Sequence, residues 1–108
     1  MAKMTPQTVD LVAERFRTLG EPMRLRILDA LRQGERSVGE LVELTRGGQA
    51  NVSKHLQILL SGGLVTRRKA GTTAYYSLTD PTVFQLCDIV CGRVEDQIET
   101  RRQALRRR

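Results

Sequence analysis

The chain has 108 residues, of which 40% are hydrophobic and 28% charged, and its formal net charge is +6. A chain of this length forms one compact domain with one modest core, which leaves no room for a second domain. No stretch approaches the roughly 18 consecutive apolar residues of a membrane-spanning helix, and the N-terminal segment lacks the apolar run of a signal peptide. We therefore expect a cytoplasmic protein that has no membrane partner.

The charges are segregated along the chain. Residues 44–79 contain five Lys or Arg residues and no carboxylate, whereas residues 1–43 contain seven residues of each sign. Residues 80–100 have a balance of −4, and the last eight residues add five arginines. An acid-free basic segment is what a phosphate-binding surface needs, because each neutralised phosphate releases counterions and adds affinity. The alternative is a chance distribution in which the charges serve only solubility.

Three helices are predicted in the first half of the chain. Residues 8–19 form the first helix, which the glycine after them ends by tolerating a left-handed cap. The second helix begins at Pro22 and has apolar residues three and four apart until Gly34 ends it. Ser37 and Glu40 have the spacing of a capping box, which predicts a short third helix directly after Ser37.

A turn and a fourth helix follow. The segment Arg46-Gly47-Gly48 ends the third helix, because two adjacent glycines have a large entropic cost inside a helix and suit a tight turn. A fourth helix is predicted over residues 49–61, where apolar residues recur on one face. A pair of glycines ends it.

Beyond the fourth helix the hydrophobic period changes from helical to alternating. Residues 64–69 and 73–78 are two short strands joined around Gly71, which is the pattern of a β-hairpin. Tyr75 and Tyr76 point to opposite faces of their strand, so one is expected in the core and the other exposed.

A last helix begins at Pro81, and its apolar stripe needs another surface to cover it. In so small a protein the obvious surface is a second copy of the chain. The predicted fold class is mainly α with a small β-hairpin, in the order α-α-α-α-β-β-α, dimerising through the terminal helices. One domain is expected over residues 1–100, followed by a frayed Arg-rich tail over residues 101–108.

Two short helices joined by a glycine-containing turn and followed by a basic hairpin form a winged helix-turn-helix. The major groove of B-DNA is about 12 Å wide and admits one α-helix. The second helix of the pair can therefore present side chains to base edges while the hairpin, or wing, reaches nearby phosphates. This arrangement predicts binding to double-stranded DNA, and a dimer would recognise an inverted repeat.

The fourth helix has a polar outward face when its apolar stripe packs on the core. Gln49 and Asn51 can hydrogen-bond adenine edges, and Lys54 can reach guanine or phosphate. The predicted DNA-binding residues are Gln49, Ala50, Asn51, Ser53, Lys54 and Gln57 on the helix and Arg67, Arg68, Lys69 and Thr72 on the hairpin. The alternatives are an ordinary solvated helix face and a charged hairpin edge that prevents aggregation.

A resemblance to a known family covers about residues 12–98. The chain resembles the ArsR/SmtB family of bacterial repressors, which are winged-helix homodimers, in the runs LGEPMRLRILDAL, VGELVELT and QANVSKHLQILLSGGLVTRRKAGTTAYYSL. The resemblance implies that Gln49, Ser53 and Lys54 contact bases or nearby phosphates. His55 matches a histidine common in the family, which adds it to the DNA-binding set, although a lone histidine on this flank is more often structural.

Members of this family sense metals or thiol-reactive signals, and the chain departs from both standard metal sites. The third-helix motif Glu-Leu-Cys-x-Cys is replaced by Glu40-Leu41-Val42-Glu43-Leu44, which has no thiol. The dimer-helix zinc site uses Asp and His pairs, and the last helix here contains no histidine. The sequence therefore predicts neither site.

Cys87 and Cys91 lie one helical turn apart, so both sulfurs share one face of the last helix. With the partner helix they could bind a soft metal ion or respond to an oxidant. The alternative is that both are reduced, buried core residues. We expect folding to require no cofactor, and any soft-metal or redox signal to act at these two thiols.

The predicted function is a sequence-specific, double-stranded DNA-binding transcriptional regulator, acting as a homodimeric repressor that a thiol-reactive or metal signal releases. An enzyme is not expected, because the one histidine lies in a basic helix with no carboxylate near it in sequence. The alternative is an architectural or ligand-independent winged-helix module that binds DNA or protein. A regulator protects a short inverted repeat, whereas an architectural protein shows little sequence preference.

Overall fold

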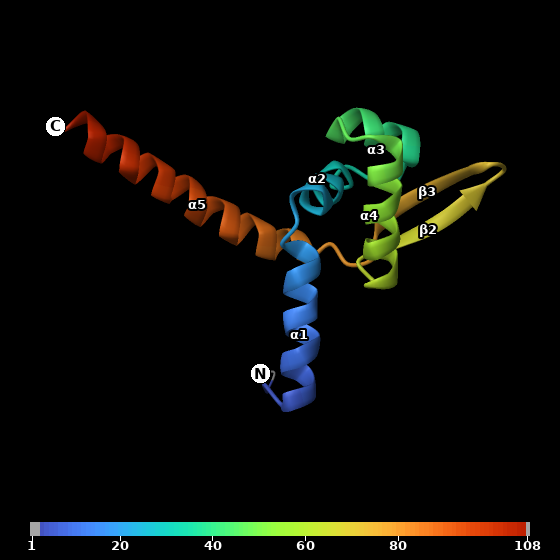
Figure 1. Cartoon of the computed structure of the whole chain (residues 1–108), viewed down its shortest axis with the longest axis horizontal. Helices are drawn as coiled ribbons and strands as arrows, with labels where there is room; N and C mark the ends of the chain where they lie inside the picture. The colour runs from blue at the N-terminus through green and yellow to red at the C-terminus, as the bar shows by residue number, and fades with distance from the viewer. Residues whose placement is uncertain (1–2, 108) are drawn as a thin grey trace.

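A computed structural model of the chain describes residues 3–107. Its elements are, in order, α1 (Pro6–Leu19), α2 (Pro22–Ala30), β1 (Arg36–Ser37), α3 (Val38–Thr45), α4 (Gln49–Ser61), β2 (Val65–Ala70), β3 (Thr73–Leu78) and α5 (Val83–Arg106). The predicted winged helix-turn-helix fold class is confirmed, with the short strand β1 added. Figure 1 shows α2, α3 and α4 grouped together, with the β2–β3 hairpin on one side and α5 on the other. None of the helices in residues 3–107 is long and apolar enough to cross a membrane.

Local capping interactions fix where α1 and α3 begin. The Thr5 side chain accepts a hydrogen bond from the backbone N–H of Thr8, which starts α1 two residues before the predicted position. Ser37 and Glu40 form the predicted capping box at α3, each side chain accepting from the other residue's backbone N–H. The second helix ends earlier than predicted, at Ala30, and a turn leads to Gly34, whose φ is 134°.

The core lies where α2, α3 and α4 meet the sheet. Its fully buried members come from four elements: Ile27, Leu28, Leu41, Val52, Leu56, Leu59 and Val65. The apolar stripes predicted for the second and fourth helices both contribute to this cluster, and Leu41 of α3 joins them. Because both helices of the helix-turn-helix bury one face here, their opposite faces are left for solvent or a ligand.

The sheet has the strand order β1-β3-β2, and all neighbours are antiparallel. Strand β1 has only two residues, which lie directly before the α3 cap, and no alternating pattern marks so short a strand in the sequence. Tyr76 is buried, as expected for one of the two tyrosines. Tyr75 is half-buried, with the guanidinium of Arg68 5.0 Å from the centre of its ring.

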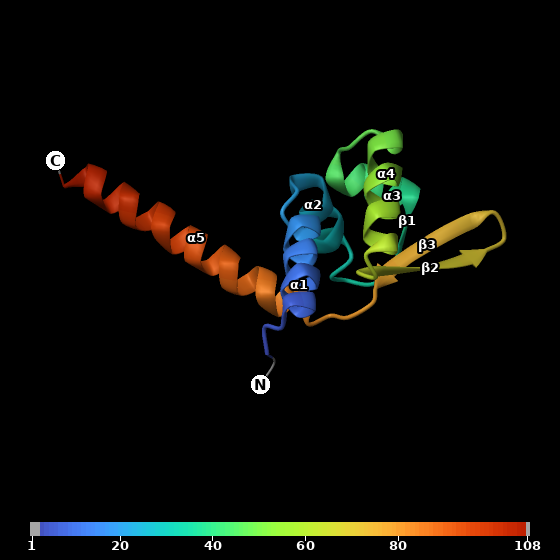
Figure 2. The ribbon, with the colours of Figure 1, turned by 60° about the horizontal axis from the view of Figure 1, so that its bottom comes forward.

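Arg32 attaches the beginning of α5 to α2. Its Nη2 and Nη1 atoms lie 2.6 and 3.3 Å from the two carboxylate oxygens of Asp88, and its guanidinium lies 4.3 Å from the centre of the Phe84 ring. The hydrogen bond from Arg32 lowers the pKa of Asp88 below its usual value. Beyond this attachment α5 projects away from the rest of the molecule, as both Figure 1 and Figure 2 show.

Helix α5 is longer than predicted. It continues through residues 101–106, so the expected frayed tail is wrong for this stretch; residue 108 lies outside the described range. The segment RRQALR consists entirely of strong helix formers and contains neither glycine nor proline. The predicted boundary at residue 100 therefore falls inside a continuous helix.

Candidate nucleic-acid interface

The turn between α3 and α4 depends on the close approach of Gly47 to the core. A Cβ atom at this position would lie 2.8 Å from Cε of Met23 and 2.9 Å from Cγ2 of Val52. The left-handed residue of the turn is Arg46, with φ 57°, while Gly48 has an ordinary extended conformation. The prediction of a turn is confirmed, but the reason differs, because Gly47 supplies space where we expected it to supply backbone freedom.

Replacing Gly47 with alanine is expected to destabilise the protein by about 1–3 kcal/mol, because Met23 or Val52 must move to accept the new methyl group. Gly48→Ser is the matched control, since a Cβ atom at Gly48 would have no neighbour within 4 Å among residues 3–107 and serine suits the N-cap of α4. Urea unfolding of both variants checks this expectation. Equal stabilities of Gly47→Ala and the wild type would contradict the packing argument.

Most of the predicted helix residues lie on the outward face of α4. The side chains of Gln49, Ala50, Asn51, Lys54 and Gln57 are exposed, and Ser53 is half-buried. Helix α4 contains no carboxylate, so Lys54 has no acidic neighbour on its own helix. This face combines amide donors and acceptors, a methyl group, a hydroxyl and a cation, which are the groups that read base edges in a major groove.

His55 lies on the buried flank of α4, one turn after Asn51, and is 7% exposed. Its Nδ1 atom is 3.1 Å from Nη1 of Arg24 and 3.6 Å from Oε2 of Glu21, both near the start of α2. A side chain held among these groups points into the protein, which argues against a DNA contact for His55. The alternative role, that of a structural histidine, fits this location.

The hairpin divides its three basic residues between two faces. Arg67 is the cross-strand partner of buried Tyr76, whereas Arg68 is the partner of Tyr75. Cross-strand partners point to the same face of a sheet, so Arg67 is on the same face as buried Tyr76. Residues two apart in a strand also share a face, so Lys69 lies there too. We call this face the core-side face of the hairpin. Thr72 is exposed beside Gly71, whose φ of 64° forms the hairpin turn.

Arg68 is already paired within the protein. Its Nη2 atom lies 2.5 Å from Oε1 of Glu35, which is in the turn between α2 and β1. The hydrogen bond from Arg68 lowers the pKa of Glu35, so the carboxylate is charged at neutral pH. Sequence reasoning missed this pair because its members are 33 residues apart and neither residue carries a local signal.

The hairpin lies next to α4, on the side of the molecule away from α5. In Figures 1 and 2 the hairpin begins near the C-terminal end of α4 and extends away from α5. The C-terminal end of α5, with its arginines, lies at the opposite end of the molecule. The two basic regions, residues 44–79 and 101–107, are therefore separated in space as well as in sequence.

A groove of about 420 Å³ lies between α1, α2 and α5 and is largely apolar. Cys87 and Cys91 line it together with Phe16, Leu25 and Val90. Cys87 is half-buried and Cys91 exposed, so Cys91 does not fit the expectation of a buried core residue. No group of three or more His, Cys, Asp or Glu side chains within residues 3–107 is arranged to hold a metal ion.

The Cys91 thiol donates a hydrogen bond to Oε1 of Glu95, 3.6 Å away. The carboxylate raises the pKa of the thiol, first through this hydrogen bond and then through its charge. Because the thiolate is the species that binds metals and reacts with electrophiles, Glu95 makes Cys91 less reactive at neutral pH.

Alkylation of Cys91 by iodoacetamide at pH 8 is therefore expected to be faster in a Glu95→Gln variant than in the wild type, since the substitution removes the charge that stabilises the protonated thiol. Mass spectrometry of the two cysteines measures the rates separately, and Cys87 provides the internal control. An unchanged rate at Cys91 would show that Glu95 does not govern its reactivity.

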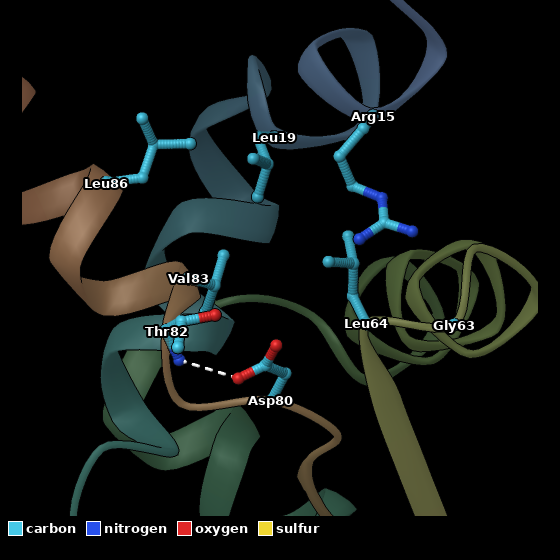
Figure 3. Close-up of a pocket in the computed structure, with 8 residues that line it drawn as sticks. All are labelled: Arg15, Leu19, Gly63, Leu64, Asp80, Thr82, Val83 and Leu86. Atoms are coloured by element: carbon cyan, nitrogen blue, oxygen red, sulfur yellow. Dashed lines mark hydrogen bonds between the residues drawn. The ribbon is translucent and has the colours of Figure 1, made fainter. Parts of the chain in front are cut away.

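A second, smaller pocket of about 280 Å³ lies where α1, the end of α4 and the start of α5 meet (Figure 3). Asp80 accepts a hydrogen bond of 2.9 Å from the backbone N–H of Thr82, which lowers the pKa of Asp80. Arg15 and Leu64 line another side of the pocket. None of the predicted site residues lines it, and the Asp80–Thr82 contact serves to begin α5.

Comparison with known proteins assigns the family. The family described as "Bacterial regulatory protein, arsR family" matches residues 21–67. The HTH-type transcriptional regulator Rv0081 of Mycobacterium tuberculosis is 40% identical over 77 residues, which cover 70% of this chain and 68% of that protein. The HTH-type transcriptional repressor SmtB of the same species is 36% identical over 93 residues, covering 85% of this chain and 69% of that protein.

A solved structure agrees in fold over nearly the whole chain. The homodimeric winged helix-turn-helix DNA-binding domain Mb0332 from Mycobacterium bovis has a TM-score of 0.77 at 34% identity, with 93% of each chain covered. The match includes the helix-turn-helix, the hairpin and the flanking helices described above. The chain belongs to the ArsR/SmtB family of winged helix-turn-helix transcriptional regulators.

Proposed function

We propose that the protein is a homodimeric transcriptional repressor that binds an inverted repeat in double-stranded DNA through α4 and the β2–β3 hairpin. The single observation that supports this most strongly is the adjacency of two elements. Helix α4 has an exposed face without carboxylates, and the basic hairpin begins near the C-terminal end of this helix and extends away from α5.

In this proposal α4 enters the major groove with its N-terminal half against the bases. Gln49 and Asn51 hydrogen-bond adenine edges, and Lys54 reaches a guanine or a phosphate. The N-terminus of α4 adds backbone N–H groups and the positive end of the helix dipole, both of which favour a phosphate close by. Ala50, Ser53 and Gln57 complete the contact face.

The hairpin supplies phosphate contacts beside the groove. We assign this role to Arg67 and Lys69, which lie on the core-side face of the hairpin, and to Thr72 at its tip. Arg68 takes a smaller part, because its charge is balanced by Glu35 in the free protein. A phosphate that approached Arg68 would have to compete with this ion pair.

The second copy is expected on the apolar faces of α1 and α5. Leu86, Val90, Val94 and Ile98 follow one another at intervals of four along α5, and each is at least one-third exposed. Phe16 of α1, 54% exposed, shares the apolar groove with Val90. A stripe of this kind in one chain marks a protein-protein contact, and the Mb0332 neighbour is described as homodimeric.

Selection of bound sequences from random duplex DNA tests the proposed function. A homodimeric repressor enriches an inverted repeat whose half-sites are about one helical turn apart, or a multiple of it. Binding without enrichment of any sequence would favour the alternative of an architectural DNA-binding protein. Absence of binding at low salt would refute both.

A soft-metal or redox signal at Cys87 and Cys91 stays a prediction. The two thiols line one groove at the proposed dimer face, which supports it, whereas the raised pKa of Cys91 opposes it. If the thiols sense such a signal, mercuric ion or peroxide lowers the DNA affinity of the wild type and leaves a Cys87→Ser, Cys91→Ser double variant unaffected. An equal response of both proteins to either reagent would exclude these thiols as the sensor.

A further inference from the structure

The guanidinium of Arg24 contacts two helices besides its own. Its Nε atom donates to the carbonyl oxygen of Thr18, 2.6 Å away, and its Nη2 atom lies 3.4 Å from the carbonyl oxygen of Arg17, both at the C-terminal end of α1. Its Nη1 atom is 3.1 Å from Nδ1 of His55 in α4. One side chain of α2 therefore joins the end of α1 to the buried side of α4.

The contact with α1 satisfies a helix terminus. The last carbonyl groups of a helix have no partner within it, and a cation there also interacts favourably with the helix dipole. Thr18 is itself 8% exposed, so water has little access to this end of α1. Arg24 supplies the donor that the carbonyl of Thr18 needs, and this fixes the guanidinium relative to α1.

The contact with α4 fixes the orientation of His55. An arginine guanidinium can only donate, so a hydrogen bond between Arg24 and His55 uses Nδ1 of His55 as the acceptor. Glu21, whose Oε2 atom accepts from the backbone N–H of Arg24, lies 3.6 Å from the same Nδ1 atom. The backbone N–H of Arg24 is the main cause of the lowered pKa of Glu21, which keeps this carboxylate charged beside the guanidinium.

We propose that Arg24 is a positioning residue that couples α1 to α4 through its hydrogen bond to His55. The inference rests on the proposed function, in which α1 lies at the dimer face and α4 contacts DNA. Because the Arg24 guanidinium contacts both α1 and α4, a movement of α1 is transmitted to α4. It acts on the buried side of α4, which faces away from the DNA. The orientation of α4 in the major groove thus depends on a residue that makes no contact with DNA.

The test uses the full chain, a duplex selected by the wild type and a scrambled duplex of equal length. Arg24→Lys retains the charge but cannot hold both the α1 carbonyl and His55. His55→Leu removes the acceptor, whereas His55→Asn keeps an acceptor oxygen near the position of Nδ1. Arg26→Lys is the matched control, because Arg26 is an exposed arginine of α2 without an ion pair or side-chain hydrogen bond among residues 3–107.

Arg24→Lys and His55→Leu are each expected to weaken binding to the selected duplex by about tenfold or more, with a smaller effect on the scrambled duplex. His55→Asn is expected to stay within about threefold of the wild type, and Arg26→Lys to match it. Hydrogen exchange of the α4 amides is expected to be faster in the two weakened variants and to be restored in His55→Asn.

Three results would overturn the proposal. The first is wild-type affinity in Arg24→Lys or His55→Leu, and the second is a His55→Asn variant as weak as His55→Leu. The third is an equal loss on both duplexes that follows the unfolded fraction, because this would make Arg24 a residue of general stability only. A failure of the proposed function is distinguishable from these results. It would appear in the selection experiment, as a wild-type protein that enriches no sequence, before any variant is made.

Discussion

A Val94→Glu substitution is expected to dissociate the homodimer and thereby abolish tight binding to DNA. Val94 lies in the middle of the apolar stripe of α5 and is 46% exposed in the single chain. A two-fold interface would bury the new carboxylate twice, and burial of each unpaired charge costs several kcal/mol. We expect the dimer dissociation constant to rise by at least about a hundredfold, which corresponds to about 2.7 kcal/mol.

The matched control for Val94→Glu is Gln103→Glu. Residue 103 lies nine positions further along α5, which is two and a half turns, and is therefore on the opposite side of the same helix. The Gln103→Glu substitution adds the same charge to the same exposed helix but lies outside the apolar stripe. Sedimentation equilibrium measures both dimer constants, and a Val94→Glu variant that remains dimeric would place the dimer interface elsewhere.

Removal of Arg67 and Lys69, the two cations on the core-side face of the hairpin, is expected to produce a large loss of DNA affinity. In an Arg67→Gln, Lys69→Gln double variant, a dimer loses four positive charges that the proposal places at phosphates. Each phosphate contact contributes about 0.9 to the slope of log affinity against log salt, so the slope is expected to become shallower by about 3 to 4. Binding to all sequences is expected to weaken similarly, on the order of a hundredfold at 0.1 M salt.

A Glu35→Gln, Arg68→Gln double variant is the control for this prediction. It also changes two residues next to the hairpin, but it removes one charge of each sign and leaves the net charge unchanged. We expect its salt dependence to stay close to that of the wild type. If this variant flattened the salt dependence as much as the Arg67, Lys69 variant, the division of the hairpin into two faces would be wrong.

The elements that the sequence predicts well are those specified by local chemistry. The Ser37 and Glu40 capping box, the helix over residues 49–61 and the hairpin turn at Gly71 each depend on a few neighbouring residues. The outward face of α4 follows from its apolar stripe alone, because burial of one side of a helix determines the other.

The features that sequence reasoning misses depend on contacts between distant segments. Arg24 and His55 are 31 residues apart, and nothing in the sequence around either one indicates that they meet. The resemblance to the family adds His55 to the DNA-binding set, but its position in the helical turn places it on the inner side of α4. Similarly, the pairing of Arg68 with Glu35 distinguishes two adjacent arginines that look equivalent in sequence.

An NMR titration of the ¹⁵N-labelled protein with the selected duplex identifies the residues of the DNA-binding face. Amide shifts are expected to change chiefly in residues 49–57 and 67–72, while those of the C-terminal turns of α5 change little. The arginines at the end of α5 form the rival basic surface, at the opposite end of the molecule. Perturbations concentrated in residues 101–107, with α4 and the hairpin unchanged, would contradict the assignment of the DNA-binding face.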